Sequence, residues 1–197
     1  MSPEPRFADA GHTLGDFSTH FLVQCPHCAA RAIVRQGDQR LLCTGCHHTE
    51  MPGRWYGAWR LTVSRRCTVC GAHALKSVET GHLRPKLSLR CDECGDEREY
   101  RAQASRLPRH DGLVTDPVYG LPLWLQAEFQ GQLCWALNNE HLDYLRRYVG
   151  AKLRERGILP RNSIRKNSSL LSRLPDFIKK ARNREALLRF FDQLEQR

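Results

Sequence analysis

The sequence has no long apolar run, and this absence excludes several classes of protein. No stretch approaches the roughly 18–20 apolar residues of a membrane-spanning helix, so we expect no membrane partner. Residues 1–16 also lack the apolar segment of a signal peptide. Apolar residues make up only 41% of the chain, below the usual share in globular proteins. This composition predicts small units held by metal and a helical end rather than one large core.

Catalytic motifs are missing as well. The sequence has no glycine-rich phosphate-binding loop and no recognisable pairing of a nucleophile with a base. Cys134 stands outside any such motif, and we expect it to be a small buried side chain. We therefore expect no enzymatic activity and no small-molecule substrate.

Cysteine is what the sequence does have, concentrated in one stretch. Eight of the nine cysteines form four Cys-x-x-Cys pairs, with 14 residues between the first two pairs and 20 between the last two. This spacing is typical of two successive four-cysteine zinc sites. The expected ligands of two structural Zn²⁺ ions are Cys25, Cys28, Cys43, Cys46, Cys67, Cys70, Cys91 and Cys94.

Four thiolates fill a tetrahedral site and leave no position for water or substrate, which indicates a structural role for the metal. Iron also binds four thiolates, and zinc is the favoured ion. His27, His47 and His48 lie beside the first site and are interpreted as exposed loop residues. Paired cysteines that bind metal favour a reducing, cytoplasmic location.

Strand and turn signals around the cysteines predict the fold class. We expect a small metal-bound α+β protein, in which two tandem four-cysteine zinc β-ribbons precede a β-hairpin and a helical C-terminal module. In the second ribbon, strands 72–80 and 86–90 are expected to pair across a turn at Gly81. The other expected strands are 21–23, 30–35, 40–42, 54–65, 97–104, 121–127 and 132–137. Helices are expected from Asn138 or Asn139 to Gly157, over 176–181, and after Asn183.

Changes in composition along the chain predict five parts. Residues 1–18 form a mobile arm, in which Leu14 and Phe17 can pack on the first ribbon. Residues 19–53 are the first ribbon, and 54–104 are a linking strand with the second. Residues 105–119 contain Pro108, Gly112 and Pro117 and indicate a linker. Residues 120–197 hold the hairpin and a basic helical module.

Positive charge is concentrated near the C-terminus. The chain has a formal net charge of +10, and the segment 144–189 holds fourteen basic and three acidic residues. A basic segment of this kind favours nucleic-acid backbone as a partner, whereas a solvated face or docking on an acidic protein is the alternative. The expected nucleic-acid-binding residues are Arg146, Arg147, Lys152, Arg154, Arg165, Lys166, Lys179, Lys180, Arg182 and Arg184. Trp55, Tyr56 and Trp59 form either a base-stacking platform or a seam between modules.

The C-terminal part contains five distinctive runs, which are Leu121-Pro122-Leu123-Trp124-Leu125-Gln126, Trp135-Ala136-x-Asn138-x-Glu140-His141-Leu142, Tyr148-Val149-x-Ala151-x-Leu153-Arg154-Glu155-Arg156, Ser172-Arg173-Leu174-Pro175 and Ala181-Arg182-Asn183-Arg184. In these runs the chain resembles a group of largely uncharacterised bacterial zinc-ribbon proteins. Members often carry cysteines near Gly131, where this chain has Phe129 and Gln130. The resemblance implies a bacterial origin and assigns no activity. The ribbons themselves resemble those of transcription and translation factors.

These observations predict an accessory protein that binds nucleic acid. DNA or RNA backbone contacts are expected from the basic C-terminal module, with the zinc ribbons as structural parts. The alternative is an adaptor subunit of a bacterial complex, which would dock on a protein partner through the ribbons and the hairpin.

Overall fold

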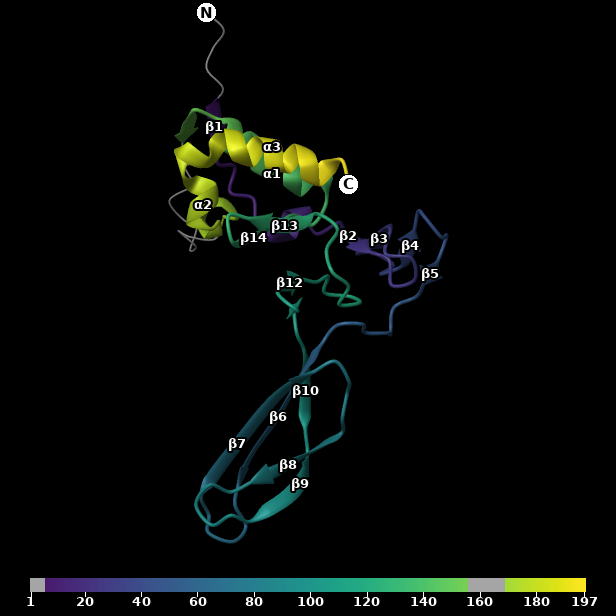
Figure 1. The fold of residues 1–197 in the computed structure, drawn as a ribbon, viewed down its shortest axis with the longest axis vertical. Coiled ribbons are helices and arrows are strands. Elements are labelled where there is room, and N and C mark those ends of the chain that lie inside the picture. Colours follow the sequence, from purple (N-terminus) through teal and green to yellow (C-terminus); the bar gives the residue numbers. More distant parts are fainter. Residues whose placement is uncertain (1–5, 156–168) are drawn as a thin grey trace, which may run out of the picture. The chain divides into compact units, whose positions relative to one another are not determined.

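A computed structural model describes residues 6–155 and 169–197, and shows a small α+β protein built mostly of strands (Figure 1). The chain divides into two compact units. Unit 1 combines Met1–Pro52 with Leu123–Arg197, and unit 2 is Gly53–Pro122. Among the helices of the described ranges, none is long and apolar enough to cross a membrane.

Unit 1 contains a four-stranded antiparallel sheet whose strands lie side by side in the order in which they occur along the chain. Its strands are β2 (His20–Gln24), β3 (Arg31–Arg35), β4 (Leu41–Cys43) and β5 (Thr49–Glu50). Ala32 and Val34 of β3 are fully buried, whereas Arg31 and Arg35 are exposed, as the two-residue period of a strand requires. The positions of β3 and β4 agree with the strands expected at 30–35 and 40–42.

The C-terminal part of unit 1 is a hairpin followed by helices. Strands β13 (Gln126–Phe129) and β14 (Gln132–Trp135) pair around Gly131. Helices α1 (Asn139–Gly150) and α3 (Arg184–Glu195) are the longest, and α2 (Asp176–Lys179) is short; 3₁₀ turns lie at η2 (Leu171–Arg173) and η3 (Ala181–Asn183). In α1, Leu142, Leu145 and Val149 share the buried stripe, as their spacing predicts.

Two expectations about unit 1 are wrong. Helix α1 ends at Gly150 and not at Gly157, because Ala151 is extended and β15 (Leu153–Glu155) follows. The first eighteen residues are not simply an arm, because β1 (Arg6–Ala8) pairs in parallel with β15. Within the same segment, η1 (Leu14–Phe17) brings Phe17 against the core of unit 1.

The first cysteine sheet and the helical module share one core. The Leu22 N–H donates to the Leu137 carbonyl at 2.8 Å, and the Trp124 N–H donates to the Leu22 carbonyl at 2.8 Å. These bonds cover the outer edge of β2. Sixteen buried residues, from Leu22 in β2 to Leu194 in α3, form a continuous cluster. The expectation of small separate cores is therefore wrong for unit 1, because β2 carries apolar residues on both faces.

The second cysteine cluster of the chain lies on two small sheets of unit 2. One has the order β10 (Gln103–Arg106), β6 (Trp59–Arg66) and β7 (His73–Thr80), and the other pairs β8 (Lys86–Arg90) with β9 (Glu97–Arg101). The expected pairing of 72–80 with 86–90 is wrong, because β7 takes β6 as its partner over eight residue pairs. Five buried residues of β6, β7 and β8 form one hydrophobic cluster in this unit, Leu61, Val63, Ala74, Leu87 and Leu89.

The segment expected as a linker, 105–119, is ordered. It contains the end of β10 and the short strands β11 (Arg109–His110) and β12 (Leu113–Val114). Asp116 then closes a tight loop, because its fully buried carboxylate accepts N–H groups from Val118, Tyr119 and Leu121 at 2.7–2.9 Å. Burial nevertheless raises the pKa of Asp116. The proline and glycine residues of this segment therefore belong to an ordered loop and not to a linker.

A close approach of two glycines completes this loop. Gly120 has a φ of +72°, and a Cβ there would lie 2.7 Å from Gly57 N and 2.7 Å from the Trp55 ring. Only glycine fits such a contact. Trp55 also meets the Trp59 ring edge to face, and the Arg106 guanidinium lies 4.7 Å over the Trp55 ring. These contacts favour the packing role for Trp55 over a free stacking platform.

Candidate metal centres

Each cysteine pair closes a β-hairpin. The pair Cys25–Cys28 connects β2 to β3, and the other three pairs join β4 to β5, β6 to β7 and β8 to β9. The last hydrogen-bonded positions before and after each pair face one another, as Gln24 and Arg31 do in the first. Two such hairpins meet at each cluster, so the sheets fix the four sulfurs from both sides.

The four sulfurs of each cluster have the spacing that a tetrahedral metal site requires. All Sγ atoms within a cluster lie within 4.8 Å of one another. The shorter separations are 3.7 and 3.6 Å in the first cluster and 3.6 and 3.5 Å in the second. Metal–sulfur bonds of about 2.3 Å put tetrahedral sulfurs about 3.8 Å apart. Each cluster can therefore hold one metal ion, and every cysteine in it is free of disulfide bonds.

Backbone N–H groups point at the sulfurs from within the hairpin turns. In the first cluster, the Cys46 N–H lies 3.4 Å from Cys43 Sγ and helps to lower the pKa of that thiol to about 6. In the second, the Cys70 N–H lowers the pKa of the Cys67 thiol to about 7. A lower pKa favours the thiolate, which is the form that binds metal.

The residue after each pair has a left-handed backbone. Gly71 and Gly95, at φ values of +77° and +75°, follow the third and fourth pairs. Ala29 and His47 occupy the matching positions in the first cluster, at φ values of +57° and +58°. The same turn is thus built four times, twice with glycine and twice with a residue that is strained there.

The histidines near the first cluster stand beside the sulfurs rather than in the ligand set. The His27 and His48 rings stack with centroids 3.8 Å apart, and His48 Nε2 lies 3.3 Å from a Glu50 carboxylate oxygen. Across residues 6–155 and 169–197, the clusters with metal-ligand spacing contain cysteine alone. Cys134 belongs to neither cluster; it is 2% exposed, and burial raises the pKa of its thiol to about 12.

Arg146 and Arg184, two of the ten residues expected to bind nucleic acid, join separate elements of unit 1. The Arg146 guanidinium lies 2.6 Å from Asp143, 2.6 Å from Glu195 and 3.3 Å from Asp192, so it joins α1 to α3. Arg184 donates to the carbonyls of Val149 and Ala151 at 3.1 and 3.0 Å, which satisfies the C-terminal end of α1. The charge of both arginines therefore serves the fold.

The remaining basic residues are distributed as follows. Arg147 is exposed on α1, and its guanidinium lies 5.9 Å from the centroid of the Tyr144 ring. Lys152 is exposed between α1 and β15, Lys180 and Arg182 are exposed after α2, and Lys179 donates to the Ser172 carbonyl at 3.1 Å. Arg154 lies in β15 and its side chain is not described, whereas Arg165 and Lys166 lie outside the described residues.

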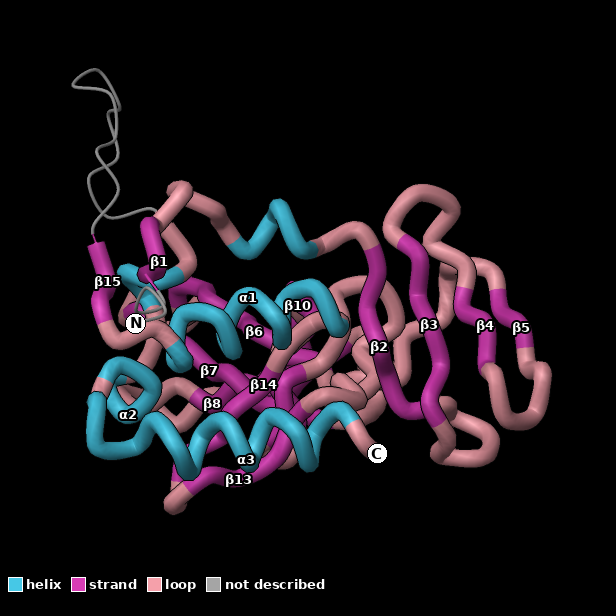
Figure 2. The backbone as a smooth tube through the Cα atoms, turned by 90° about the horizontal axis from the view of Figure 1, so that it is seen from above, coloured by secondary structure: helices cyan, strands magenta, loops and turns pink. Residues whose placement is uncertain are grey.

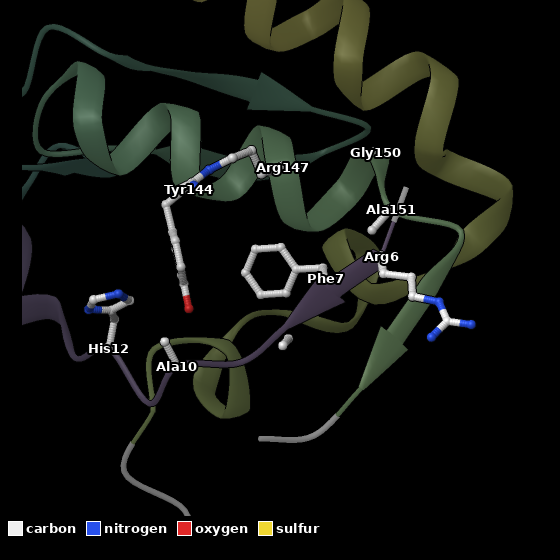
Figure 3. A pocket seen from close by; sticks show the side chains of 9 residues that line it. Arg6, Phe7, Ala10, His12, Tyr144, Arg147, Gly150 and Ala151 are labelled. Carbon is white, nitrogen blue, oxygen red and sulfur yellow. The ribbon is translucent and has the colours of Figure 1, made fainter. Parts of the chain in front are cut away.

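Figure 3 shows a hollow beside Arg147 that the sequence did not indicate. It has a volume of about 470 Å³, and its lining includes Arg6, Phe7, His12, Tyr144 and Arg147. The N-terminal strand β1 and the C-terminal half of α1 form its opposite sides. A basic residue of β1 and a basic residue of α1 therefore line the same hollow.

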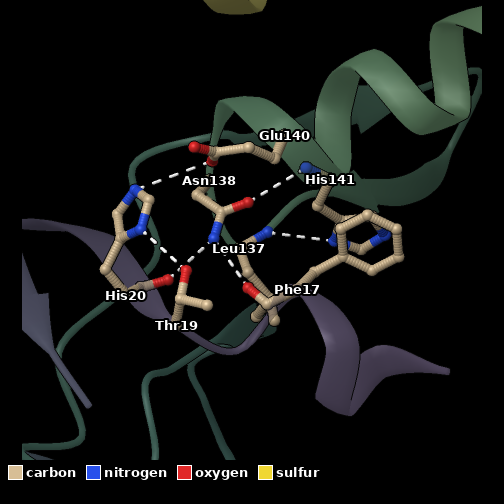
Figure 4. A network of polar contacts seen from close by, with 7 residues as sticks. All are labelled: Phe17, Thr19, His20, Leu137, Asn138, Glu140 and His141. Carbon is tan, nitrogen blue, oxygen red and sulfur yellow. Dashed lines mark hydrogen bonds and ion pairs between the residues drawn. The ribbon is translucent and has the colours of Figure 1, made fainter. Parts of the chain in front are cut away.

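The run Trp135–Leu142, which carries the resemblance, proves to be a structural motif (Figure 4). The fully buried Asn138 caps α1 by accepting the His141 N–H at 2.9 Å. Its amide donates to the carbonyls of Phe17 and His20 at 2.7 and 2.9 Å. Glu140 lies 3.8 Å from His20, and the Leu137 N–H donates to His141 Nδ1 at 3.2 Å. The motif therefore ties the N-terminal segment to the start of α1.

Comparison with known proteins adds no family assignment: no family model matches the chain, and neither a curated protein nor a solved structure is significantly similar to it.

Proposed function

We propose that this protein is an accessory factor that binds the phosphate backbone of DNA or RNA through the basic end of unit 1. In Figure 2, β1, β15 and α2 lie at the end of unit 1 away from β2–β5. We define the basic end by Arg6, Arg147, Lys152, Lys180 and Arg182, which come from three separate parts of the chain. This convergence is the observation that carries the proposal, because phosphate binding needs several cations on one surface.

The charge of the neighbouring segment supports the same surface. Residues 156–168 contain four basic residues and no acidic one. This segment follows β15, which pairs with β1, and the chain returns at Leu170, whose N–H donates to the His12 carbonyl at 2.7 Å. The described residues on both sides of this segment therefore contact the N-terminal stretch 6–12, and the segment's charge of +4 adds to the attraction of the chain for a polyanion.

In this proposal the two cysteine clusters are zinc β-ribbons with a structural role. Zinc is favoured over iron because four-thiolate sites with this spacing are typical of structural zinc. Metal content by mass spectrometry of the native protein tests this part separately. Two zinc ions per chain are expected, and iron or a metal-free folded chain would contradict it.

The test of nucleic-acid binding is fluorescence anisotropy with labelled duplex DNA, single-stranded DNA and RNA at two or more salt concentrations. The variant R147E/K180E/R182E is expected to weaken binding at least tenfold. On duplex DNA, log K falls as log salt rises, and each lost phosphate contact makes this slope less steep by about 0.9. Arg146 and Arg184 are left unchanged, because their replacement would disturb the packing of α1.

A matched control separates a specific surface from net charge alone. R65E/R84E/R101E changes the charge of exposed residues in unit 2 by the same amount. It is expected to keep most of the affinity and the salt dependence. Absence of binding to every probe at low salt, or equal losses in both triple variants, would contradict the proposal.

A further inference from the structure

A row of apolar side chains crosses one face of the sheet β2–β5. In the observed register, Leu22 faces Ile33, Ile33 faces Leu42, and Leu42 faces Thr49. Directly paired residues in an antiparallel sheet project to the same side. The row therefore starts in β2 and ends at the edge strand β5.

This row leads from the core of unit 1 out to solvent. Leu22 is 5% exposed and belongs to the core, Ile33 is partly buried against that core, and Leu42 is 43% exposed. Met51, directly after β5, is 64% exposed. Beside the row lies a groove of about 570 Å³ that Thr19, His20, Ile33, Arg35, Gly37 and Asp38 line. Large aliphatic side chains exposed next to a groove are typical of a binding surface.

Positive charge lies on both sides of the row. Arg31 precedes Ile33 by two residues and Arg35 follows it by two, so both project to the same face as Ile33. Arg31 and Arg35 are exposed, and so is Arg40 in the turn that follows β3. Two acidic residues lie nearby: Asp38 is 2.8 Å from Arg35, and Glu140 is 3.8 Å from His20, which lines the groove. The surface around the row therefore has a net positive charge.

We propose that this face, defined by Arg31, Ile33, Arg35 and Leu42, binds a short acidic amphipathic segment of a partner protein. Apolar side chains of the segment would cover Ile33 and Leu42, and its carboxylates would pair with the arginines on either side. The row has no aromatic side chain on which a base could stack, which disfavours single-stranded nucleic acid. A second copy of the same face would oppose arginine to arginine, which disfavours self-association.

This surface is separate from the basic end, so the two proposals can fail independently. The test begins with a display library of random 16-residue peptides selected on the full-length, metal-loaded protein. Enriched peptides are expected to combine aliphatic or aromatic residues with Asp and Glu. Binding of the best fluorescein-labelled peptide is then measured by anisotropy.

Two substitutions on the face give the decisive readout. L42D is expected to weaken the peptide at least tenfold, and R31E to weaken it several-fold with a reduced salt dependence. L75D, which changes a more exposed leucine of unit 2 (64%), and R147E/K180E/R182E are expected to bind as the unchanged protein does. Because Leu42 is 43% exposed, L42D is expected to keep its metal and its helical circular dichroism signal.

Several outcomes would overturn the proposal. The selection could enrich no peptide, the enriched peptides could lack acidic residues, or their affinity could be the same for L42D and R31E as for the unchanged protein. Sedimentation that shows L42D-sensitive dimers, or nucleic-acid binding that L42D and R31E abolish, would assign the face to one of the disfavoured occupants and equally overturn it.

Discussion

At the scale of single residues, a few buried polar side chains fix the chain where its loops meet. Asn138 makes three hydrogen bonds, and Asp116 accepts three backbone N–H groups. His141 differs from them, because its Nδ1 accepts the Leu137 N–H while Nε2 has no partner within the described part of the chain. The rings of Phe17 and Trp135 pack against it. Such a site accommodates neutral imidazole and disfavours its protonated form.

The burial of His141 predicts a pH-dependent stability for unit 1. Burial lowers the pKa of His141 to about 4, whereas an unfolded histidine has a pKa of about 6.5. Between pH 6.5 and pH 4, His141 is protonated in the unfolded chain but neutral in the folded one. The free energy of unfolding therefore has its full value above pH 6.5 and falls as the pH decreases toward 4. The loss totals about 3 kcal/mol, of which about 1 kcal/mol is expected by pH 5.5.

Denaturant unfolding, followed by circular dichroism at several pH values, measures this loss. The control is H141N, whose side-chain oxygen can still accept the Leu137 N–H and does not titrate. It is expected to be less stable at pH 7.5 and to lose less stability toward pH 5.5. Parallel pH curves for the two proteins would show that His141 is not the titrating group.

At the scale of elements, the hairpin with a cysteine pair in its turn is the repeated unit of this protein. The backbone after the second cysteine is left-handed in all four copies. In unit 2 glycine occupies this position, and the space around Gly71 is open, so a methyl group there would add backbone strain without a clash.

The substitution G71A tests the importance of that conformation. It is expected to destabilise unit 2 by about 1–2 kcal/mol, the usual cost of a left-handed non-glycine residue. G81A is the matched control, because Gly81 has open space around it and a backbone that other residues adopt. Denaturant midpoints of the metal-loaded proteins provide the measurement. Equal midpoints for G71A and the unchanged protein would contradict the prediction.

Local signals in the sequence predicted many elements, and partners distant in the chain explain the misses. The four cysteine pairs and the strands at 31–35 and 86–90 follow from spacing and alternation alone. Alternation does not say which strand pairs with which, so β6 was missed as the partner of β7. Likewise, no local pattern reveals that Arg146 meets Glu195, or that Leu42 lies beside Ile33 on an open face.

At the scale of the whole molecule, the two units differ in how much they depend on metal. The buried cluster of unit 1 has sixteen residues, whereas the cluster at the cysteine-bearing sheets of unit 2 has five. A cluster as small as this one contributes little stability to those sheets, whereas one structural zinc contributes roughly 10–16 kcal/mol in small peptides. Unit 2 should therefore depend on its metal far more than the helical part of unit 1 does.

Removal of metal with a chelator at neutral pH is expected to unfold unit 2 and to leave α1 and α3 folded. Hydrogen exchange read by mass spectrometry should show loss of protection in β6–β9 and retained protection in both helices. Addition of zinc should restore the protection of β6–β9. Loss of protection in α1 and α3 together with β6–β9, or unchanged protection in β6–β9, would contradict the prediction.

The division of unit 1 into two stretches of sequence has a consequence for synthesis on the ribosome. Unit 2, Gly53–Pro122, is inserted within unit 1 and is complete before Leu123 has been made. The backbone groups of Leu22 must wait for Trp124 and Leu137 to emerge, about 100 residues later. At about 5–20 residues per second, β2 spends many seconds with an open, apolar edge. Early capture of metal by Cys25, Cys28, Cys43 and Cys46 would hold β2 against β3 during that interval, so metal supply is expected to affect the yield of correctly assembled chains.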